Sequence, residues 1–170
     1  DKATKAGEKM MPVTAGITAL GAAGGAASME LDNGYDTIIT KTGATGEALE
    51  SLTTVADNVF SDMPTTMDDV GVAVGEVNTR FGATGTELEN LSKEFIKFAN
   101  INGTDLNTAI DSVDSIMTKF GVDASQTKNV LGLMTKAGQD TGISMETLET
   151  ALTTNGASLK EMGLDLTSSV

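Results

Sequence analysis

The chain has 170 residues, with 24 acidic and 11 basic side chains, a net charge of −13, and neither Cys nor His. Without Cys there is no disulfide, thiolate zinc site or iron–sulfur cluster, and without His there is no imidazole base, His-ligated metal or Ser-His-Asp triad. The acidic excess also argues against specific nucleic-acid binding, because phosphate contacts are made by clustered Lys and Arg.

The first 45 residues differ in composition from the rest. An uncharged run from Met10 to Met29 is rich in Gly and Ala, and its length, though not its low hydrophobicity, is that of a membrane span. Gly21 and Gly25 form a small-xxx-small pair that lets two helices approach closely. We therefore expect residues 1–45 to form a Gly/Ala-rich helical segment that packs in an oligomer or a lumen, with membrane insertion or a flexible linker as the alternatives. The candidate positions are Gly16, Gly21 and Gly25.

Two polar stretches have the composition of turns. Residues 32–36 read Asp-Asn-Gly-Tyr-Asp, and residues 100–103 read Asn-Ile-Asn-Gly. Their carboxylates and amides invite a calcium interpretation, but the ligand spacing of a calcium-binding loop is absent from both. The sequence therefore predicts a helix break at each stretch.

The chain repeats itself after residues 42–45. The tetrapeptide Gly-Ala-Thr-Gly at 43–46 recurs 39 residues later at 82–85, and each copy is followed at the same distance by Leu-Glu and then Leu. A weaker third copy begins at Gly121. Such a period indicates a supersecondary unit stacked on copies of itself. We predict that residues 46–170 are a helical-repeat region and a fragment of a longer chain.

The apolar residues of this region recur at helical spacing. Leu88, Leu91, Phe95 and Phe98, for example, are separated by three or four positions, which places them on one helix face. We expect this face, and its counterparts in the neighbouring helices, to form helix-packing interfaces. The candidate packing residues are Leu49, Leu52, Leu88, Leu91, Phe95, Phe98, Leu106, Ile110, Val113 and Phe120.

Capping residues divide the region into helices. Thr66, Thr86 and Asp123 each precede an acidic residue or Gln by three positions, as at helix starts. Glycines at 82, 103, 121, 142, 156 and 163 indicate helix ends. The sequence thus predicts an all-α fold of Gly-punctuated hairpins in approximate 39-residue repeats. The expected helices lie near 46–62, 66–81, 86–101, 104–119, 124–139 and 144–154, with a short one near 158–162.

No residue pattern favours an enzyme. The carboxylate pairs at 68–69, 87 and 89, and 111 and 114 are typical of solvated helix faces, and nothing distinguishes one pair as an acid and base. Ser92-Lys93, and Ser158 with Lys160, have no supporting context for nucleophilic chemistry. A phosphate-binding loop is absent. We therefore assign no catalytic, cofactor-binding or metal-binding residue.

Several short motifs, taken in order, point to a family. Pro-Val-Thr-Ala-Gly-Ile at 12–17, a Gly/Ala-rich helix, Met-Glu-Leu-Asp at 29–32, Thr-Gly-Ala-Thr-Gly at 42–46 and the Thr/Ser-capped helices that follow are all present. This order resembles the core region of siphophage-type phage tail tape measure proteins, over essentially the whole chain.

The resemblance implies a structural virion protein of the tail tube lumen, which sets tail length during assembly in the host cytoplasm and leaves with the DNA at infection. The implied partners are sister copies, the tail tube protein, tail-assembly chaperones and tail-tip proteins, with the host inner membrane as a further candidate. A generic bacterial helical-repeat adaptor is the alternative outside phage. Gly-punctuated helices of about 15 residues favour a folded-back arrangement over an extended rod.

Overall fold

The computed structural model describes residues 26–170. The described part of the chain forms eight α-helices and one 3₁₀ turn and contains no strand, so the predicted all-α class is confirmed. The helices are α3 (Ala26–Thr42), α4 (Glu47–Asp62), α5 (Met67–Phe81), α6 (Gly85–Asn102), α7 (Leu106–Phe120), α8 (Thr127–Thr141), α9 (Met145–Glu161) and α10 (Leu166–Ser169), and the 3₁₀ turn is Ala124–Gln126.

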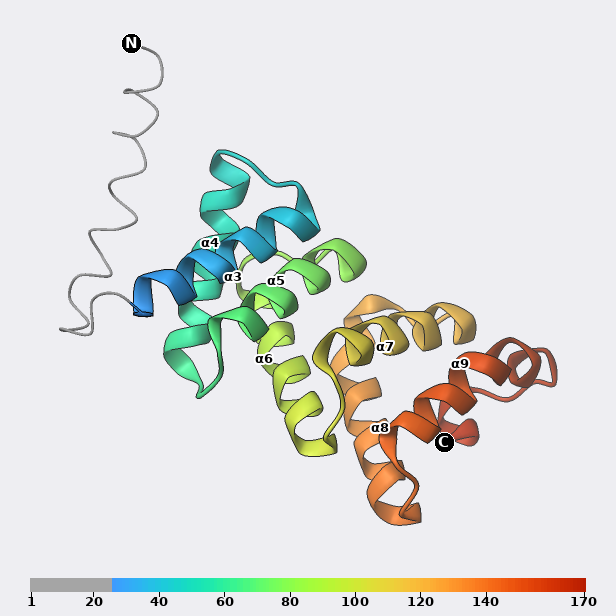
Figure 1. Cartoon of the computed structure of the whole chain (residues 1–170). Helices are drawn as coiled ribbons and strands as arrows, with labels where there is room; N and C mark the ends of the chain where they lie inside the picture. The colour runs from blue at the N-terminus through green and yellow to red at the C-terminus, as the bar shows by residue number, and fades with distance from the viewer. Residues whose placement is uncertain (1–25) are drawn as a thin grey trace, which may run out of the picture.

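The helices pack in two layers. In the first layer α4 packs on α6 and α6 on α8. In the second layer α3 packs on α5, α5 on α7 and α7 on α9. Consecutive helices from α4 to α9 also contact each other, which joins the layers. Figure 1 shows the resulting stack, with α3 and α4 toward one end and α8 and α9 toward the other. The described chain therefore folds back on itself at every turn.

Caps explain where the helices of the second layer begin and end. The side chains of Thr66, Asp105 and Ser144 accept hydrogen bonds from backbone N–H groups of the first turns of α5, α7 and α9. α5 and α7 end at Gly82 and Gly121, whose φ angles of 67° and 68° lie in the left-handed region that favours glycine. The starts of α5, α7 and α9 are evenly spaced in the sequence.

The core lies between the layers and continues along the stack. Phe95 of α6 is fully buried, and its ring lies 5.4 Å from that of Phe81 at the end of α5. Leu88, Val113 and Met134 are also fully buried, on α6, α7 and α8. Because apolar residues recur on the inner face of each helix, the core needs no single large cluster of aromatic side chains.

Two predicted breaks are wrong. α3 continues through residues 32–36. Gly34 lies within this helix at the point where the backbone of α5 comes closest, and the absence of a side chain leaves room for that contact. α9 continues through Gly156 to Glu161, so the short helix expected near 158–162 is part of α9. A Cβ on Gly156 would lie 2.9 Å from the ring of Phe120, so this glycine permits packing rather than ending the helix.

Other boundaries moved by a few residues. Thr84, not Thr86, is the N-cap of α6, which begins at Gly85. The helix expected from 124 begins as the 3₁₀ turn, with Asp123 accepting a hydrogen bond from the backbone N–H of Ser125. The short helix α10 was not expected from the sequence. The break predicted at 100–103 is confirmed, since α6 ends at Asn102 before Gly103.

Candidate functional site

The expected packing residues lie on the inner helix faces. Leu49 and Leu91 are half-buried against the core, and the other eight are buried. The fully buried members are Leu88, Phe95, Ile110 and Val113. Gly16, Gly21 and Gly25, together with most of the uncharged run from Met10 to Met29, lie outside the described residues. Their packing role and the division into residues 1–45 and 46–170 stay predictions.

The closest helix contact involves residues that the sequence reasoning missed. α3 and α5 run in the same direction, and a Cβ on Gly71 of α5 would lie 2.5 Å from the carbonyl oxygen of Gly34. One turn later, a Cβ on Gly75 would lie 2.9 Å from the Cβ of Lys41. The glycines at 71 and 75 have the small-xxx-small spacing that allows two helices to approach closely. From the sequence, this pattern was considered only at Gly21 and Gly25.

Charged residues connect the helices of the second layer. Glu76 of α5 accepts hydrogen bonds from Lys41 of α3 and from Arg80, each at 2.6 Å. Arg80 also pairs with Asp111 of α7 at 2.9 Å, and Lys119 of α7 donates to the backbone carbonyl of Thr153 on α9. A basic side chain therefore joins each helix of this layer to the next.

Glu76 is charged at neutral pH despite its burial. Burial disfavours the carboxylate, but the hydrogen bonds from Lys41 and Arg80 outweigh this effect and hold its pKa below the usual range. The same hydrogen bond to Glu76 raises the pKa of Arg80. Asp111 and Asp114, considered above as a carboxylate pair, both lie within ion-pair distance of Arg80. The pair therefore has a structural role at this interface.

The first layer is connected in a similar way. Lys93 of α6 pairs with Asp62 of α4 at 2.5 Å and with Glu89 at 2.8 Å, and Lys128 of α8 pairs with Glu94 of α6 at 3.4 Å. Pairs of this kind on a surface contribute about 0–1 kcal/mol each. They orient neighbouring helices more than they stabilise them.

A half-buried tyrosine joins α3 to α4. The Tyr35 hydroxyl donates a 2.5 Å hydrogen bond to Oδ1 of Asp57. Burial raises the pKa of Tyr35, and the hydrogen bond to the Asp57 carboxylate raises it further. Tyr35 is the only Tyr in the sequence, and it anchors the first helix of the described stack to the layer beneath it.

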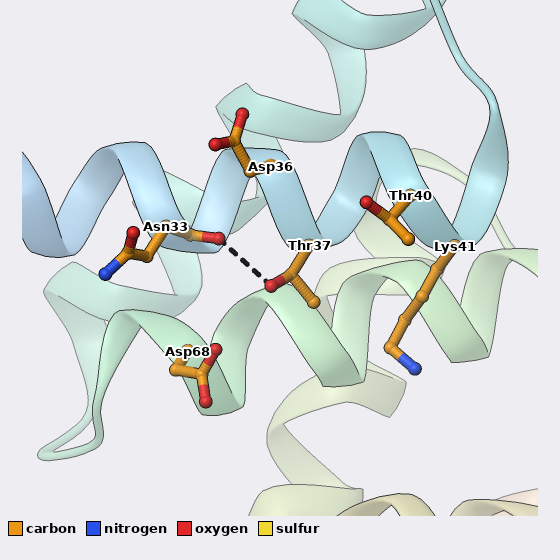
Figure 2. Close-up of a pocket in the computed structure, with 6 residues that line it drawn as sticks. All are labelled: Asn33, Asp36, Thr37, Thr40, Lys41 and Asp68. Atoms are coloured by element: carbon orange, nitrogen blue, oxygen red, sulfur yellow. Dashed lines mark hydrogen bonds between the residues drawn. The ribbon is translucent and has the colours of Figure 1, made fainter.

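A shallow depression runs along α3 beside α5. Figure 2 shows its lining residues, Asn33, Asp36, Thr37, Thr40 and Lys41 on α3 and Asp68 on α5. The Thr37 hydroxyl donates to the carbonyl of Asn33 one turn earlier, and Nζ of Lys41 is engaged by Glu76 and Asn107. These partners lie within the protein, so Thr37 and Lys41 are both engaged in contacts of the helices themselves.

A second cavity, of about 330 Å³, lies where the turn between α6 and α7 meets the start of α9. Its lining includes Asp105, Glu146 and Glu149. Glu149 is 3% exposed, and its Oε1 is buried without a hydrogen-bond partner among the described residues. Sequence reasoning did not find this carboxyl group, because Glu149 lies in a polar stretch of α9 with no motif around it.

Among the described helices, none is both long enough and apolar enough to cross a bilayer. In the same part of the chain, no three acidic side chains are grouped so that they could hold a metal ion.

Comparison with known families matches most of the helical stack. A family model described as phage-related minor tail protein matches residues 53–169, which is more than half of the chain and includes α5 to α9 completely. A search of curated proteins found no match, and neither did a search of solved structures. The chain therefore belongs to the phage-related minor tail protein family.

Proposed function

We propose that this chain is a segment of a tape measure protein, which occupies the lumen of the tail tube, sets tail length during assembly and leaves with the DNA. Membership in a minor tail protein family supports a structural role in the virion. The sequence resemblance to the tape measure core supports the more specific role. No catalytic activity is part of the proposal.

The observation that carries the proposal is the linear stacking of helix pairs. Each helix packs on the next helix of its own layer, which is the next but one along the chain, so the stack grows along one direction as residues are added. We infer that the repeating unit is the 39-residue segment of the sequence repeat. In such an arrangement the number of residues sets a length, which is what a tape measure requires.

The conformation in the tail decides how much length a unit supplies. Packed helices lie about 8–10 Å apart, so one folded pair adds about 10 Å to a stack. A straight helix of 39 residues would span about 58 Å. The folded stack is the form of the free protein in this proposal, and unstacking in the tube would increase its reach about sixfold.

The charge suits a protein in a DNA conduit. A net charge of −13 repels the DNA phosphates, so the chain and the DNA can leave through the same tube without adhering. The partners in this proposal are sister copies, the tail tube protein, tail-assembly chaperones and tail-tip proteins. Specific nucleic-acid binding is not included.

Tail length measured by electron microscopy tests the proposal. Residues 82–120 are deleted in frame from the phage gene in one strain and duplicated in another. We expect shorter tails from the deletion and longer tails from the duplication. A change of about 10 Å indicates a folded stack in the tail, and a change of about 58 Å indicates an extended chain.

The control keeps the number of residues constant. A strain carrying Phe95→Ala in the same gene should have a less stable protein but tails of normal length. Normal tail lengths in both the deletion and the duplication strain would contradict a tape measure role for this segment.

A further inference from the structure

The cavity beside α9 carries an excess of negative charge. Asp105 at the start of α7 and Glu146 and Glu149 on α9 all line it, and none of the described residues that line it is a Lys or an Arg. Thr104, Thr108 and Ser144 add hydroxyl groups. The volume of about 330 Å³ lies at the small end of the range for ligand sites, and it is large enough for an amino-acid side chain.

Glu149 is the unusual member of this group. It is almost completely buried, yet its Oε1 has no partner among the described residues. Burial raises its pKa to about 7, an effect that a hydrogen bond with Ser112 of α7 opposes and the charge of Glu146 increases. Glu149 therefore titrates near neutral pH. A buried carboxylate with a free oxygen is unfavourable, and either protonation or pairing with a cation relieves the cost.

The starts of α7 and α9 face the same cavity and carry the opposite charge. Each helix N-terminus is equivalent to about half a positive charge. Both ends are already capped, because Asp105 accepts a hydrogen bond from the N–H of Thr108 and Ser144 accepts one from the N–H of Thr147. When all three carboxylates are ionised, their negative charge exceeds the two positive half-charges of the helix N-termini. The ionised cavity therefore favours a cation.

We propose that this cavity binds a Lys or Arg side chain presented by a partner protein, and that Glu149 is the carboxylate that pairs with the charged end. The cavity has room for a guanidinium, which offers five donors to the carboxylates and hydroxyls that surround it. The net charge of −13 attracts basic partners at a distance. This site is separate from the tape measure role and does not depend on it.

The test uses the 170-residue chain and N-acetyl-arginine amide as the probe. Backbone amide NMR signals of Thr108 and Ser144 should shift and saturate as the probe is added at pH 8. Because binding requires ionised Glu149, whose pKa is about 7, the affinity at pH 6 should be about tenfold weaker. Glu149→Gln should weaken binding at least tenfold at pH 8. Glu161→Gln removes the same charge from the exposed end of α9 and should leave binding unchanged.

A second measurement applies if Glu149→Gln fails to fold. The pKa of Glu149, followed by carboxyl NMR in the wild-type chain, should fall when the arginine probe is added, and an unchanged pKa would overturn the proposal. Equal binding by the wild-type chain and Glu149→Gln would overturn the role of Glu149. Tighter binding of putrescine or Mg²⁺ than of the arginine probe at the same signals would overturn the assignment to a protein side chain.

Discussion

At the scale of single residues, the contact between α3 and α5 depends on the absence of side chains. Gly71 and Gly34 meet backbone to backbone, so a Cβ added at Gly71 would contact a carbonyl oxygen that cannot rotate away. A flexible side chain could move aside, but here the whole helix would have to shift. This close contact explains why Gly34 and Gly71 are glycines, although Ala has the higher helix propensity.

Gly71→Ala should therefore destabilise the protein by about 1–3 kcal/mol, because overpacking outweighs the better helix propensity of Ala. Gly132→Ala on α8 is the matched control, since a Cβ there meets nothing within 4 Å. That change should stabilise the protein by about 0.5–1 kcal/mol. Urea unfolding of the three chains gives both values, and stabilisation by Gly71→Ala would contradict the close packing of α3 on α5.

The buried carboxyl group of Glu149 should make stability depend on pH. Its pKa rises from an ordinary value of 4.5 to about 7 on folding, so the folded protein holds this proton more tightly than the unfolded chain does. The stabilisation from protonated Glu149 is complete below pH 4.5 and is lost as the pH rises through 7.

Glu149→Gln removes this titration. Between pH 5.5 and pH 8.5 the wild-type chain should lose about 2 kcal/mol more of its free energy of unfolding than the variant does. Urea unfolding of both chains at the two pH values measures the difference. Parallel pH dependence of the wild-type and variant chains would show that Glu149 titrates normally in the folded protein.

At the scale of elements, α6 contributes the best-buried aromatic side chain. Phe95 is fully buried beside Phe81, so Phe95→Ala should cost about 3–5 kcal/mol in thermal or urea unfolding. Ile101→Ala is the control on the same helix, because Ile101 is 66% exposed and its loss should cost less than about 0.5 kcal/mol. A loss below 1 kcal/mol for Phe95→Ala would contradict its place in the core.

Helix periodicity and capping were readable from the sequence because they are local. The cap at Thr66 and the end of α6 before Gly103 follow from side chains within one turn of the boundary. The roles of Gly34 and Gly156 were misread as breaks, because each glycine is required by a residue of another helix. A glycine that ends a helix and a glycine that admits a neighbour look the same in the sequence.

At the scale of the whole molecule, the stack should tolerate loss of a complete helix pair. Deleting residues 82–120 joins Phe81 to Gly121, which provides the glycine that α5 needs at its end. Phe81 and Arg80 would then take the places of Phe120 and Lys119 against α9. We expect a helical protein that unfolds cooperatively, with a smaller urea m-value because less surface is exposed on unfolding.

Far-UV circular dichroism during urea unfolding measures this outcome. Deleting residues 92–130 removes the same number of residues but cuts through α6 and α8, and this control should lose cooperative unfolding. Loss of cooperativity in the 82–120 deletion as well would mean that the helix pairs are not interchangeable.

The sequence by itself determined the helical class, the apolar faces and most helix boundaries, since these depend on residues within a few positions of one another. Only the tertiary structure decided that α3 packs on α5 through glycines, that basic side chains link successive helices, and that Glu149 lies buried in a cavity. These features depend on distances between residues far apart in the chain. Such distances are set when the helices pack, because packing brings together faces that local patterns describe only separately.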